Sequence, residues 1–340
     1  MKYIVLIICF LFTTSCVAQK ISELYEKANE SVVLIKTRQL EIIGPGNLKS
    51  VVSLEGVGSG FVISRDGEII TSAHVVHTAD HLLVVFSDGE ELPAKVLYSY
   101  PFADLALIKL SRPKSTPLAV VKMADSDHAK IGDQVFIIGA PFGLGHSLSV
   151  GYISGKYGGK SSASGLMTTE FFQTDAAINK GSSGAPMFNM KGEVIGIASF
   201  ILSYSKGFQG LSFTVTSNSA QRLLEGQHTV WIGLDIYLVS GLLAEILNLP
   251  QSGGVLVQNV AANSLGASMG LRGGYQIITL EGEEIVVGGD IILAIESIAL
   301  TNEDNLMNSW QIMQELKAGD SLRFKILRKG KVMELCAAIP

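Results

Sequence analysis

Short apolar runs alternate with turn residues over most of the central part of the sequence. The segments 61–72, 82–92 and 188–200 each contain short apolar runs punctuated by an Asp-Gly or Lys-Gly pair, which is the pattern of a β-hairpin. Between Gly56 and Phe213 no run of a dozen residues has the period of an amphipathic helix, so a parallel sheet with helical crossovers is disfavoured. Strands at this spacing predict antiparallel barrels or a sandwich.

The pattern changes near residue 217. The segment 217–228 predicts a helix that closes the first domain, and a second set of short strands follows it. That second set includes a helical stretch at 303–317 and a hairpin in 321–339. Several strands with one or two helices make a complete small domain. We therefore expect one domain over 19–226 and a second over 229–340. The stretch from Arg38 to Glu55 is broken by glycine and proline and predicts a mobile loop.

The N-terminus predicts export. Lys2 is followed by an apolar run that ends at Phe12, about half the ~20 residues that a membrane span needs. A charged start, a short apolar stretch and small residues are typical of a secretory signal peptide. We expect residues 1–18 to be removed by cleavage near Ala18, with lipidation at Cys16 as the alternative. The mature protein would then lie in the periplasm or the cell envelope.

Composition narrows the class of protein. The 340 residues are 47% hydrophobic and carry a net charge of −5, which allows a large core and excludes a mainly disordered chain. A nucleic-acid partner is not expected, because such proteins usually present a basic face. Only Cys9, Cys16 and Cys336 occur, so a disulfide framework does not hold this fold together.

Three segments carry residues suited to nucleophilic catalysis. His74 follows a predicted strand, Asp104 precedes another, and Ser183 lies in a glycine-rich turn. A serine nucleophile needs a base to take its proton, and that base needs a carboxylate to hold its tautomer. It also needs backbone N–H groups aimed at the developing oxyanion, which Gly181 and Ser183 could supply. The order His, Asp, Ser is that of the chymotrypsin-type double barrel, whereas an α/β-hydrolase runs Ser, acid, His.

With these residues in place, the sequence resembles the HtrA/Deg serine proteases, in which a chymotrypsin-like domain is followed by a PDZ domain. The matching stretches cover nearly all of the chain after the signal segment, at 56–76, 104–110, 131–144, 173–186, 194–218 and 261–295. The resemblance implies a mainly β fold, with two antiparallel six-stranded β-barrels followed by an α+β PDZ domain. It also implies that His74 is the general base, Asp104 its orienting carboxylate and Ser183 the nucleophile, with an oxyanion hole at Gly181 and Ser183.

The resemblance further implies a substrate site. Its primary specificity pocket would be lined by Ile178, Ile201 and Leu202, all apolar. A lysine or arginine side chain there would lose its hydration unpaired, so cleavage after small or medium aliphatic residues is expected. Ala198 and Ser199 are expected on the strand that pairs with the extended substrate backbone.

The second domain matches PDZ domains at their carboxylate-binding loop, which would be formed by Trp231, Ile232, Gly233 and Leu234. Consecutive backbone N–H groups there could capture a C-terminal carboxylate, and the peptide would add as a strand against the helix near 303–317. The resemblance also implies a homotrimer and activation by loop ordering when the PDZ domain binds its ligand.

The sequence departs from the family pattern at several positions. Lys180, Gly181 and Ser182 stand where the family commonly has Pro-Gly-Asn, and Ala185 stands where it has glycine. Lysine lacks the fixed φ of proline, so the oxyanion turn would be less rigidly prepared. The segment 271–290 carries an apparent extra hairpin within the PDZ domain.

The expected function is an exported endopeptidase of protein quality control that cleaves unfolded or damaged polypeptides without a cofactor. His74, His77 and His81 lack the spacing of a helical zinc site and no cysteine joins them, so no metal site is expected. The alternative is a weakly active or inactive protease-like module that serves as a chaperone or a peptide sensor. The departures around the nucleophile motivate that alternative.

Overall fold

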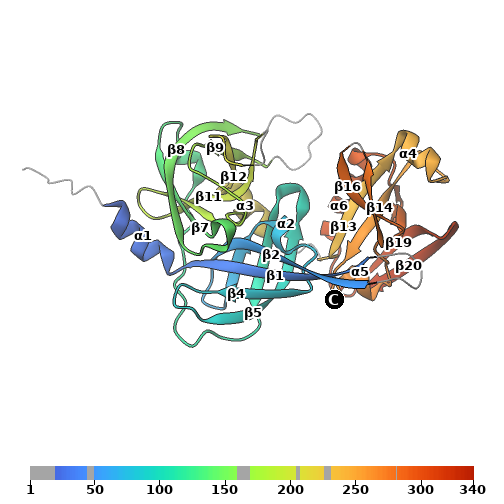
Figure 1. The fold of residues 1–340 in the computed structure, drawn as a ribbon, viewed down its shortest axis with the longest axis horizontal. Coiled ribbons are helices and arrows are strands. Elements are labelled where there is room, and N and C mark those ends of the chain that lie inside the picture. The colour runs from blue at the N-terminus through green and yellow to red at the C-terminus, as the bar shows by residue number, and fades with distance from the viewer. Residues whose placement is uncertain (1–19, 44–49, 159–168, 204–206, 226–230, 281) are drawn as a thin grey trace, which may run out of the picture.

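The computed structural model describes residues 20–43, 50–158, 169–203, 207–225, 231–280 and 282–340. Two β-barrels lie side by side in one half of the molecule, and a third β-rich part, formed by the C-terminal residues, lies next to them (Figure 1). No helix within these ranges is long and apolar enough to cross a membrane. The predicted signal peptide lies outside the described residues.

The first barrel closes in the strand order β1-β2-β3-β6-β5-β4, and its neighbouring strands are antiparallel. Its strands are β1 (Val32–Ile43), β2 (Ser50–Val62), β3 (Glu68–Thr71), β4 (His81–Val85), β5 (Glu91–Tyr100) and β6 (Leu105–Leu110). Three short elements accompany them, namely α1 (Ile21–Asn29), α2 (Ala73–Val76) and the 3-10 turn η1 (Pro101–Ala103). The strands turn alternate apolar residues inward, where Ile35, Ile69, Val84, Leu92 and Ile108 are fully buried.

The second barrel repeats this architecture in the order β10-β11-β12-β9-β8-β7. Its strands are β7 (Gln134–Gly139), β8 (Ser147–Tyr157), β9 (Phe171–Thr174), β10 (Pro186–Asn189), β11 (Val194–Ile201) and β12 (Ser212–Thr216). The 3-10 turns η2 (Ser126–His128) and η3 (Pro141–Gly143) lie in its connections, and α3 (Ser217–Glu225) follows its last strand. Two closed six-stranded antiparallel barrels confirm the predicted fold class.

One apolar cluster joins the two barrels. It contains Phe61 and Leu105 from the first barrel and Phe136 and Phe188 from the second. The rings of Phe136 and Phe188 are stacked, with centroids 4.9 Å apart and planes 17° apart. Because burying each such side chain contributes about 1.5–3 kcal/mol, this cluster holds the barrels in one orientation. Residues from both barrels can therefore meet at a fixed geometry.

The predicted loop between Arg38 and Glu55 is wrong for the described residues, which form a long antiparallel ribbon. Arg38 pairs with Glu55, and the pairing continues to Ile43 opposite Ser50. Residues 50–55 are all exposed, so this end of the ribbon has no buried face. The one-sided alternation that reveals a strand in a sequence is therefore missing, although the backbone hydrogen bonds form.

The C-terminal part is a separate sheet with the order β13-β14-β17-β19-β20, and β18 pairs with β17. Its strands are β13 (Leu234–Ser240), β14 (Gly253–Val260), β17 (Ile291–Ile295), β18 (Ile298–Ala299), β19 (Ser321–Arg328) and β20 (Lys331–Ala338). Its helices are α4 (Gly241–Ile246), α5 (Leu265–Ser268) and α6 (Glu303–Glu315), of which α6 confirms the predicted helix. Strand β13 lies at the edge of the sheet.

The predicted extra hairpin is confirmed as β15 (Gln276–Leu280) and β16 (Glu283–Val287), which form a two-stranded sheet of their own. The backbone N–H of Val286 donates to Gln258 Oε1 at 2.8 Å, which ties the hairpin to β14. Asp290, next to the hairpin, is 1% exposed and is paired with Arg328 at 2.7 Å. The same carboxylate accepts the Arg272 N–H at 2.8 Å, so both ends of the insertion are anchored.

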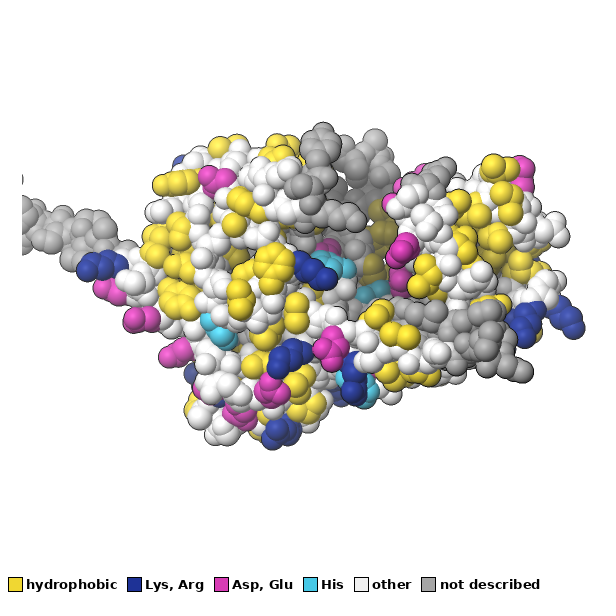
Figure 2. Space-filling view, viewed as in Figure 1, with side chains coloured by type: hydrophobic (Ala, Val, Ile, Leu, Met, Phe, Trp, Pro, Cys, Tyr) yellow, Lys and Arg dark blue, Asp and Glu magenta, His cyan; other side chains and the backbone are white. Residues whose placement is uncertain are grey.

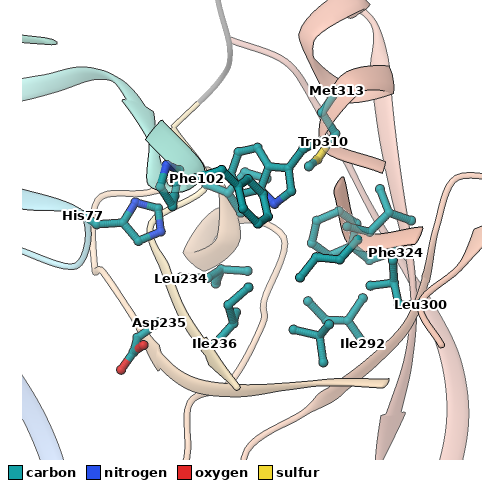
Figure 3. A pocket seen from close by; sticks show the side chains of 15 residues that line it. His77, Phe102, Leu234, Asp235, Ile236, Ile292, Leu300, Trp310, Met313 and Phe324 are labelled. Carbon is teal, nitrogen blue, oxygen red and sulfur yellow. The ribbon is translucent and has the colours of Figure 1, made fainter. Parts of the chain in front are cut away.

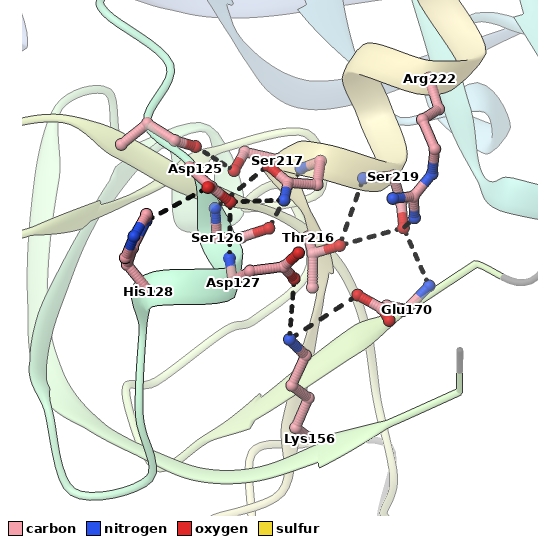
Figure 4. Close-up of polar contacts among 12 residues, drawn as sticks. Asp125, Ser126, Asp127, His128, Lys156, Glu170, Thr216, Ser217, Ser219 and Arg222 are labelled. Carbon is pink, nitrogen blue, oxygen red and sulfur yellow. Dashed lines mark hydrogen bonds and ion pairs between the residues drawn. The ribbon is translucent and has the colours of Figure 1, made fainter. Parts of the chain in front are cut away.

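A polar network attaches α3 to the second barrel (Figure 4). Ser217 Oγ donates to Ala124 O at 2.6 Å, and Asn218 Nδ2 donates to Asp125 Oδ1 at 2.6 Å. The Asn218 amide holds the pKa of Asp125 below its usual value, because hydrogen bonds to a carboxylate favour its charged form. Helix α3 is therefore fixed at its N-terminal end, where the chain leaves the barrels.

Candidate active site

His74 and Asp104 form a hydrogen-bonded pair beside the first barrel. His74 lies in α2, directly after β3, and Asp104 directly follows η1. His74 Nδ1 lies 2.7 Å from Asp104 Oδ1, and the His74 backbone N–H donates to the same oxygen at 3.1 Å. Asp104 has φ 50° and ψ 42°, a left-handed conformation that aspartate adopts more readily than most residues. The His74 side chain is 53% exposed, so with Nδ1 held by the carboxylate the ring remains accessible for proton transfer at Nε2.

Ser199 makes a contact with this pair that the sequence analysis missed. Ser199 Oγ donates to Asp104 Oδ2 at 2.5 Å, although the two residues are 95 positions apart. Both carboxylate oxygens are thus hydrogen-bonded, which fixes the plane of the carboxylate that faces the imidazole. The sequence placed Ser199 on the substrate strand only, and no local pattern indicates the direction of its hydroxyl.

Ser183 lies in a tight turn between β9 and β10, which we call the glycine turn (residues 179–185). Gly181 has φ +97° and Gly184 has φ +84°, conformations that favour glycine. A Cβ on Gly181 would lie 2.3 Å from Ala140 O, and one on Gly184 would lie 2.2 Å from Ser59 O. The glycine turn therefore packs its backbone directly on neighbouring backbone, at a distance that excludes any side chain.

The hydrogen bonds of the glycine turn determine where its N–H groups point. The carbonyl of Lys180 accepts the Phe142 N–H at 2.7 Å. In a trans peptide the carbonyl and the following N–H point in opposite directions, so the Gly181 N–H points away from Phe142. Neither the Gly181 N–H nor the Ser183 N–H donates a hydrogen bond to another residue in the described part of the chain. Neither donor is therefore used by another group in the described part of the chain.

Ala198 connects the glycine turn to the segment before His74. Its carbonyl accepts Ser72 Oγ at 2.9 Å and the Gly184 N–H at 2.7 Å, and its own N–H donates to Ala185 O at 2.8 Å. Both backbone polar groups of Ala198 are therefore used inside the protein. Ala198 and Ser199 both lie on β11, the strand predicted to pair with a substrate, and the bonds of Ala198 make it a support for the glycine turn.

The segment Ala198–Ser199 of β11 thus holds the surroundings of all three predicted catalytic residues. The Ala198 carbonyl is bonded to Ser72, which lies two positions before His74, and to Gly184, which directly follows Ser183. Ser199 is bonded to Asp104 itself. Ser183 Oγ makes no hydrogen bond to the His74 ring in this structure. Such catalytic hydrogen bonds often tighten only when a substrate is bound.

The departures from the family pattern are accommodated locally. The Lys180 carbonyl is held by the hydrogen bond from Phe142, which restrains the turn where a proline would restrain φ. Ser182 is 4% exposed, and its N–H donates to Asn179 O at 2.8 Å. Ala185 is fully buried and faces Gly139, where an added Cβ would lie 3.0 Å from the Ala185 methyl. Glycine on β7 therefore leaves the space that alanine occupies.

The three predicted pocket residues differ in their surroundings. Ile178 is 2% exposed and belongs to the core cluster of the second barrel, and Ile201 packs against the same cluster. Leu202, by contrast, is 60% exposed. The structure therefore brings Ile178 and Ile201 to one apolar cluster and leaves Leu202 at the surface.

His77 lies apart from the His74–Asp104 pair. Its Nδ1 is 2.8 Å from Ser99 Oγ, and its carbonyl accepts the Trp231 indole N–H at 2.8 Å. Burial lowers the pKa of His77 to about 4, which a backbone hydrogen bond with Leu234 partly opposes. His81 is exposed. Within the described ranges, no group of three or more His, Cys, Asp or Glu side chains could hold a metal ion.

A pocket of about 340 Å³ lies where the barrels meet the C-terminal part (Figure 3). Its lining is mainly apolar and comes from β13, β14, β17, β19 and α6 on one side and from the first barrel on the other. The barrel side contributes His77, Pro101 and Phe102. The Phe102 ring meets the Trp310 ring of α6 edge to face, with centroids 5.8 Å apart. In the space-filling view this face is hollowed between the two parts, and histidine side chains are exposed in the hollow (Figure 2).

The loop before β13 directs two of its carbonyls to the segment 261–266. Ile232 O accepts the Gly266 N–H at 2.9 Å, and Gly233 O accepts the Ala261 N–H at 2.8 Å. By the same trans-peptide geometry, the N–H groups of Gly233 and Leu234 point in the opposite direction. The Trp231 side chain packs against the apolar core of the first barrel.

A His–Asp pair on one β-barrel and a serine in a glycine turn of a second barrel form the arrangement of the chymotrypsin-like class of serine peptidases. Residues 58–197 match the family model described as a trypsin-like peptidase domain. A curated relative from Pseudomonas putida (strain GB-1), "Probable periplasmic serine endoprotease DegP-like", is 37% identical over 287 residues, covering 83% of this chain and 55% of the relative. One of the same name from Brucella suis biovar 1 is 35% identical over 261 residues, covering 75% and 49%.

Solved structures agree with these matches. The HtrA-type protease AlgW with a tripeptide is 28% identical, with a TM-score of 0.52, and the match covers 94% of this chain and 96% of that one. AlgW with a decapeptide gives 27% identity and a TM-score of 0.51. The chain belongs to the HtrA/Deg family of serine proteases. It spans about half the length of the curated relatives that it matches.

Proposed function

We propose that this chain is an exported serine endopeptidase of protein quality control that cleaves unfolded or damaged polypeptides. His74 acts as the general base, Asp104 orients it, and Ser183 is the nucleophile. One observation carries the proposal: hydrogen bonds from Ala198 and Ser199 reach Asp104 and the segments that hold His74 and Ser183. Membership of the HtrA/Deg family and relatives named as periplasmic serine endoproteases support it.

The chemistry follows from the positions of the groups. Ser183 Oγ forms a bond to the carbonyl carbon of the scissile peptide while His74 Nε2 takes its proton. The resulting oxyanion accepts hydrogen bonds from the Gly181 and Ser183 N–H groups, which have no partner in the described part of the chain. The carbon–nitrogen bond then breaks and the amine takes the proton from His74. Water hydrolyses the acyl-enzyme by the same steps and restores the serine.

The substrate class is an extended polypeptide with a small or medium aliphatic residue before the cleaved bond. Ile201, which packs against the apolar cluster that contains Ile178, supplies apolar surface for that side chain, and the exposed Leu202 supplies more. A charged side chain among these residues would lose its hydration unpaired. With Ala198 committed to the glycine turn, pairing with the substrate backbone begins at Ser199.

The C-terminal part, residues 229–340, is proposed to be a PDZ domain that follows a protease domain at 19–226. Three features support this assignment: β13 is an edge strand, α6 faces it across an apolar pocket, and the N–H groups of Gly233 and Leu234 point away from loop 261–266. A C-terminal peptide would add beside β13 with its carboxylate at those N–H groups. The AlgW structures carry a tripeptide or a decapeptide.

The cellular setting is inferred from the family and the N-terminus. We propose export to the periplasm or cell envelope, after cleavage near Ala18 or with lipidation at Cys16, and assembly as a homotrimer. The names of the relatives support the periplasmic location. Mass spectrometry of the mature N-terminus tests the two forms of processing.

Casein digestion by the wild-type protein and by Ser183→Ala tests the catalytic proposal. The wild type should degrade casein and react with a fluorophosphonate at Ser183, and the variant should do neither. Ser115→Ala, which removes an exposed hydroxyl bonded to Glu90, is the matched control and should behave as wild type. If the wild type leaves casein intact yet suppresses aggregation of a denatured protein, the chain is instead a protease-like chaperone or peptide sensor.

A further inference from the structure

A single buried serine of β2 holds the backbone of the glycine turn. Ser59 has no exposed surface, and its Oγ donates to Gly181 O at 2.8 Å while accepting the Ala140 N–H at 2.9 Å. Its own backbone N–H donates to Ser183 O at 2.8 Å. Ser59 therefore binds directly to both residues whose N–H groups are proposed to form the oxyanion hole.

The direction of the Ser59 hydroxyl proton is determined by its partners. Because Oγ accepts the N–H of Ala140, its own proton is directed to the Gly181 carbonyl. A buried hydroxyl with one donor and one acceptor is fully satisfied, and its geometry is then hard to change. The hydroxyl thus links the chain after β7 to the glycine turn, and it does so from the first barrel.

This link matters because Gly181 has no side chain to restrain its backbone, so hydrogen bonds to its flanking peptides fix its conformation. Its φ of +97° lies in a region that glycine enters and leaves easily. The peptide before Gly181 is held by the Phe142 N–H on Lys180 O at 2.7 Å, and the peptide after it is held by Ser59 Oγ. With both flanking peptides held, the Gly181 N–H has one direction. Without the hydroxyl, the second peptide keeps only the hydrogen bond from the Ser182 N–H to Asn179 O at 2.8 Å, and its buried carbonyl loses its partner.

We propose that Ser59 is a positioning residue for the oxyanion hole, acting through the Gly181 carbonyl without touching the substrate. The proposal rests on the proposed function, because it assumes that Ser183 is the nucleophile and that the Gly181 N–H stabilises the oxyanion. Removal of an oxyanion donor costs about 100- to 1000-fold in kcat. A donor that is present but poorly oriented should cost less, so we expect Ser59→Ala to lower kcat by about 10- to 100-fold.

A purely structural role for Ser59 would lower stability without this kinetic effect. We therefore measure kcat and KM on a peptide with valine before the cleaved bond. We also measure the affinity for a peptidyl trifluoromethyl ketone, which forms a charged hemiketal with the nucleophile. The same peptide ending in an amide reports binding without an oxyanion. Ser59→Ala should lower kcat and weaken the ketone by a similar factor, while KM and amide affinity stay within about threefold.

Ser217→Ala is the matched control, since Ser217 is also fully buried and its hydroxyl donates to a backbone carbonyl, that of Ala124, at 2.6 Å. It should lower the thermal midpoint while leaving kcat and ketone affinity as in the wild type. The proposal is overturned if Ser59→Ala is destabilised like this control but keeps wild-type kcat and ketone affinity.

A second variant covers the case in which Ser59→Ala does not fold. Ser59→Cys keeps the approximate volume but offers only a weak S–H donor, so it should also lose kcat and ketone affinity together. A folded Ser59→Cys protein with wild-type values of both would overturn the proposal. These results differ from failure of the proposed function, in which the wild type itself would neither cleave the peptide nor bind the ketone more tightly than the amide.

Discussion

Replacing Gly181 with alanine should remove most catalytic activity, because the glycine turn has no room for a Cβ at this position. The new Cβ would lie 2.3 Å from Ala140 O and 3.0 Å from Phe142 N. Both are backbone atoms, so neither can rotate away as a flexible side chain would. The φ of +97° adds strain of about 1–3 kcal/mol for a residue with a side chain. The peptide between Lys180 and residue 181 must therefore move.

That movement breaks the hydrogen bond from Phe142 to Lys180 and turns the residue-181 N–H away from the oxyanion. Loss of one such donor raises the activation free energy by about 2.7–4 kcal/mol, or about 100- to 1000-fold in kcat. Initial rates on a valine-containing peptide measure the effect, and thermal unfolding measures the accompanying loss of stability. KM should change much less than kcat, because the donor acts mainly in the transition state.

Gly132→Ala separates backbone strain from the loss of the donor. Gly132 has nearly the same φ, +95°, but a Cβ there would meet nothing within 4 Å. This variant should lose about 1 kcal/mol of stability from the unfavourable φ and keep wild-type kcat. If Gly181→Ala retained more than about a tenth of the activity of Gly132→Ala, the assignment of the Gly181 N–H as an oxyanion donor would be refuted.

Three further changes have defined outcomes. Ser199→Ala removes a hydrogen bond to the Asp104 carboxylate and should lower kcat/KM by about 10- to 100-fold; an unchanged pH–rate profile and rate would contradict this. The pKa of His77 in the folded protein, about 4, lies below its usual 6.5. This difference contributes about 3 kcal/mol to the free energy of unfolding above pH 6.5, and the contribution is lost as the pH falls towards 4. The thermal midpoint should fall over that range, and less steeply in His77→Gln than in the control His81→Gln. Phe102→Ala removes a ring packed against α6 and should tighten binding of an apolar C-terminal peptide by about 2- to 10-fold, measured by fluorescence anisotropy; weaker binding would count against the pocket as the peptide groove.

The β-rich class and the pairing of His74 with Asp104 could be predicted from the sequence, because their signals are local or belong to a family motif. Turn residues between alternating apolar positions predicted the class, and motif order selected His74, Asp104 and Ser183 as candidates. It failed for the ribbon between Arg38 and Glu55, because strands exposed on both faces lack the alternation that marks a buried face. Glycine and proline near the ribbon's end then gave a loop-like pattern to residues that form paired strands.

By itself, the sequence determined the class of fold, the family and the candidate reactive side chains. These depend on periodicity and on residues that lie close together within motifs. Only the tertiary structure decided that Ser199 bonds to Asp104, that Ser59 bonds to Gly181, and which way the Gly181 N–H points. The physical reason is that a hydroxyl or a peptide group takes its direction from its hydrogen-bond partner. Here the partners are 95 and 122 residues away, and they meet only when the two barrels pack together.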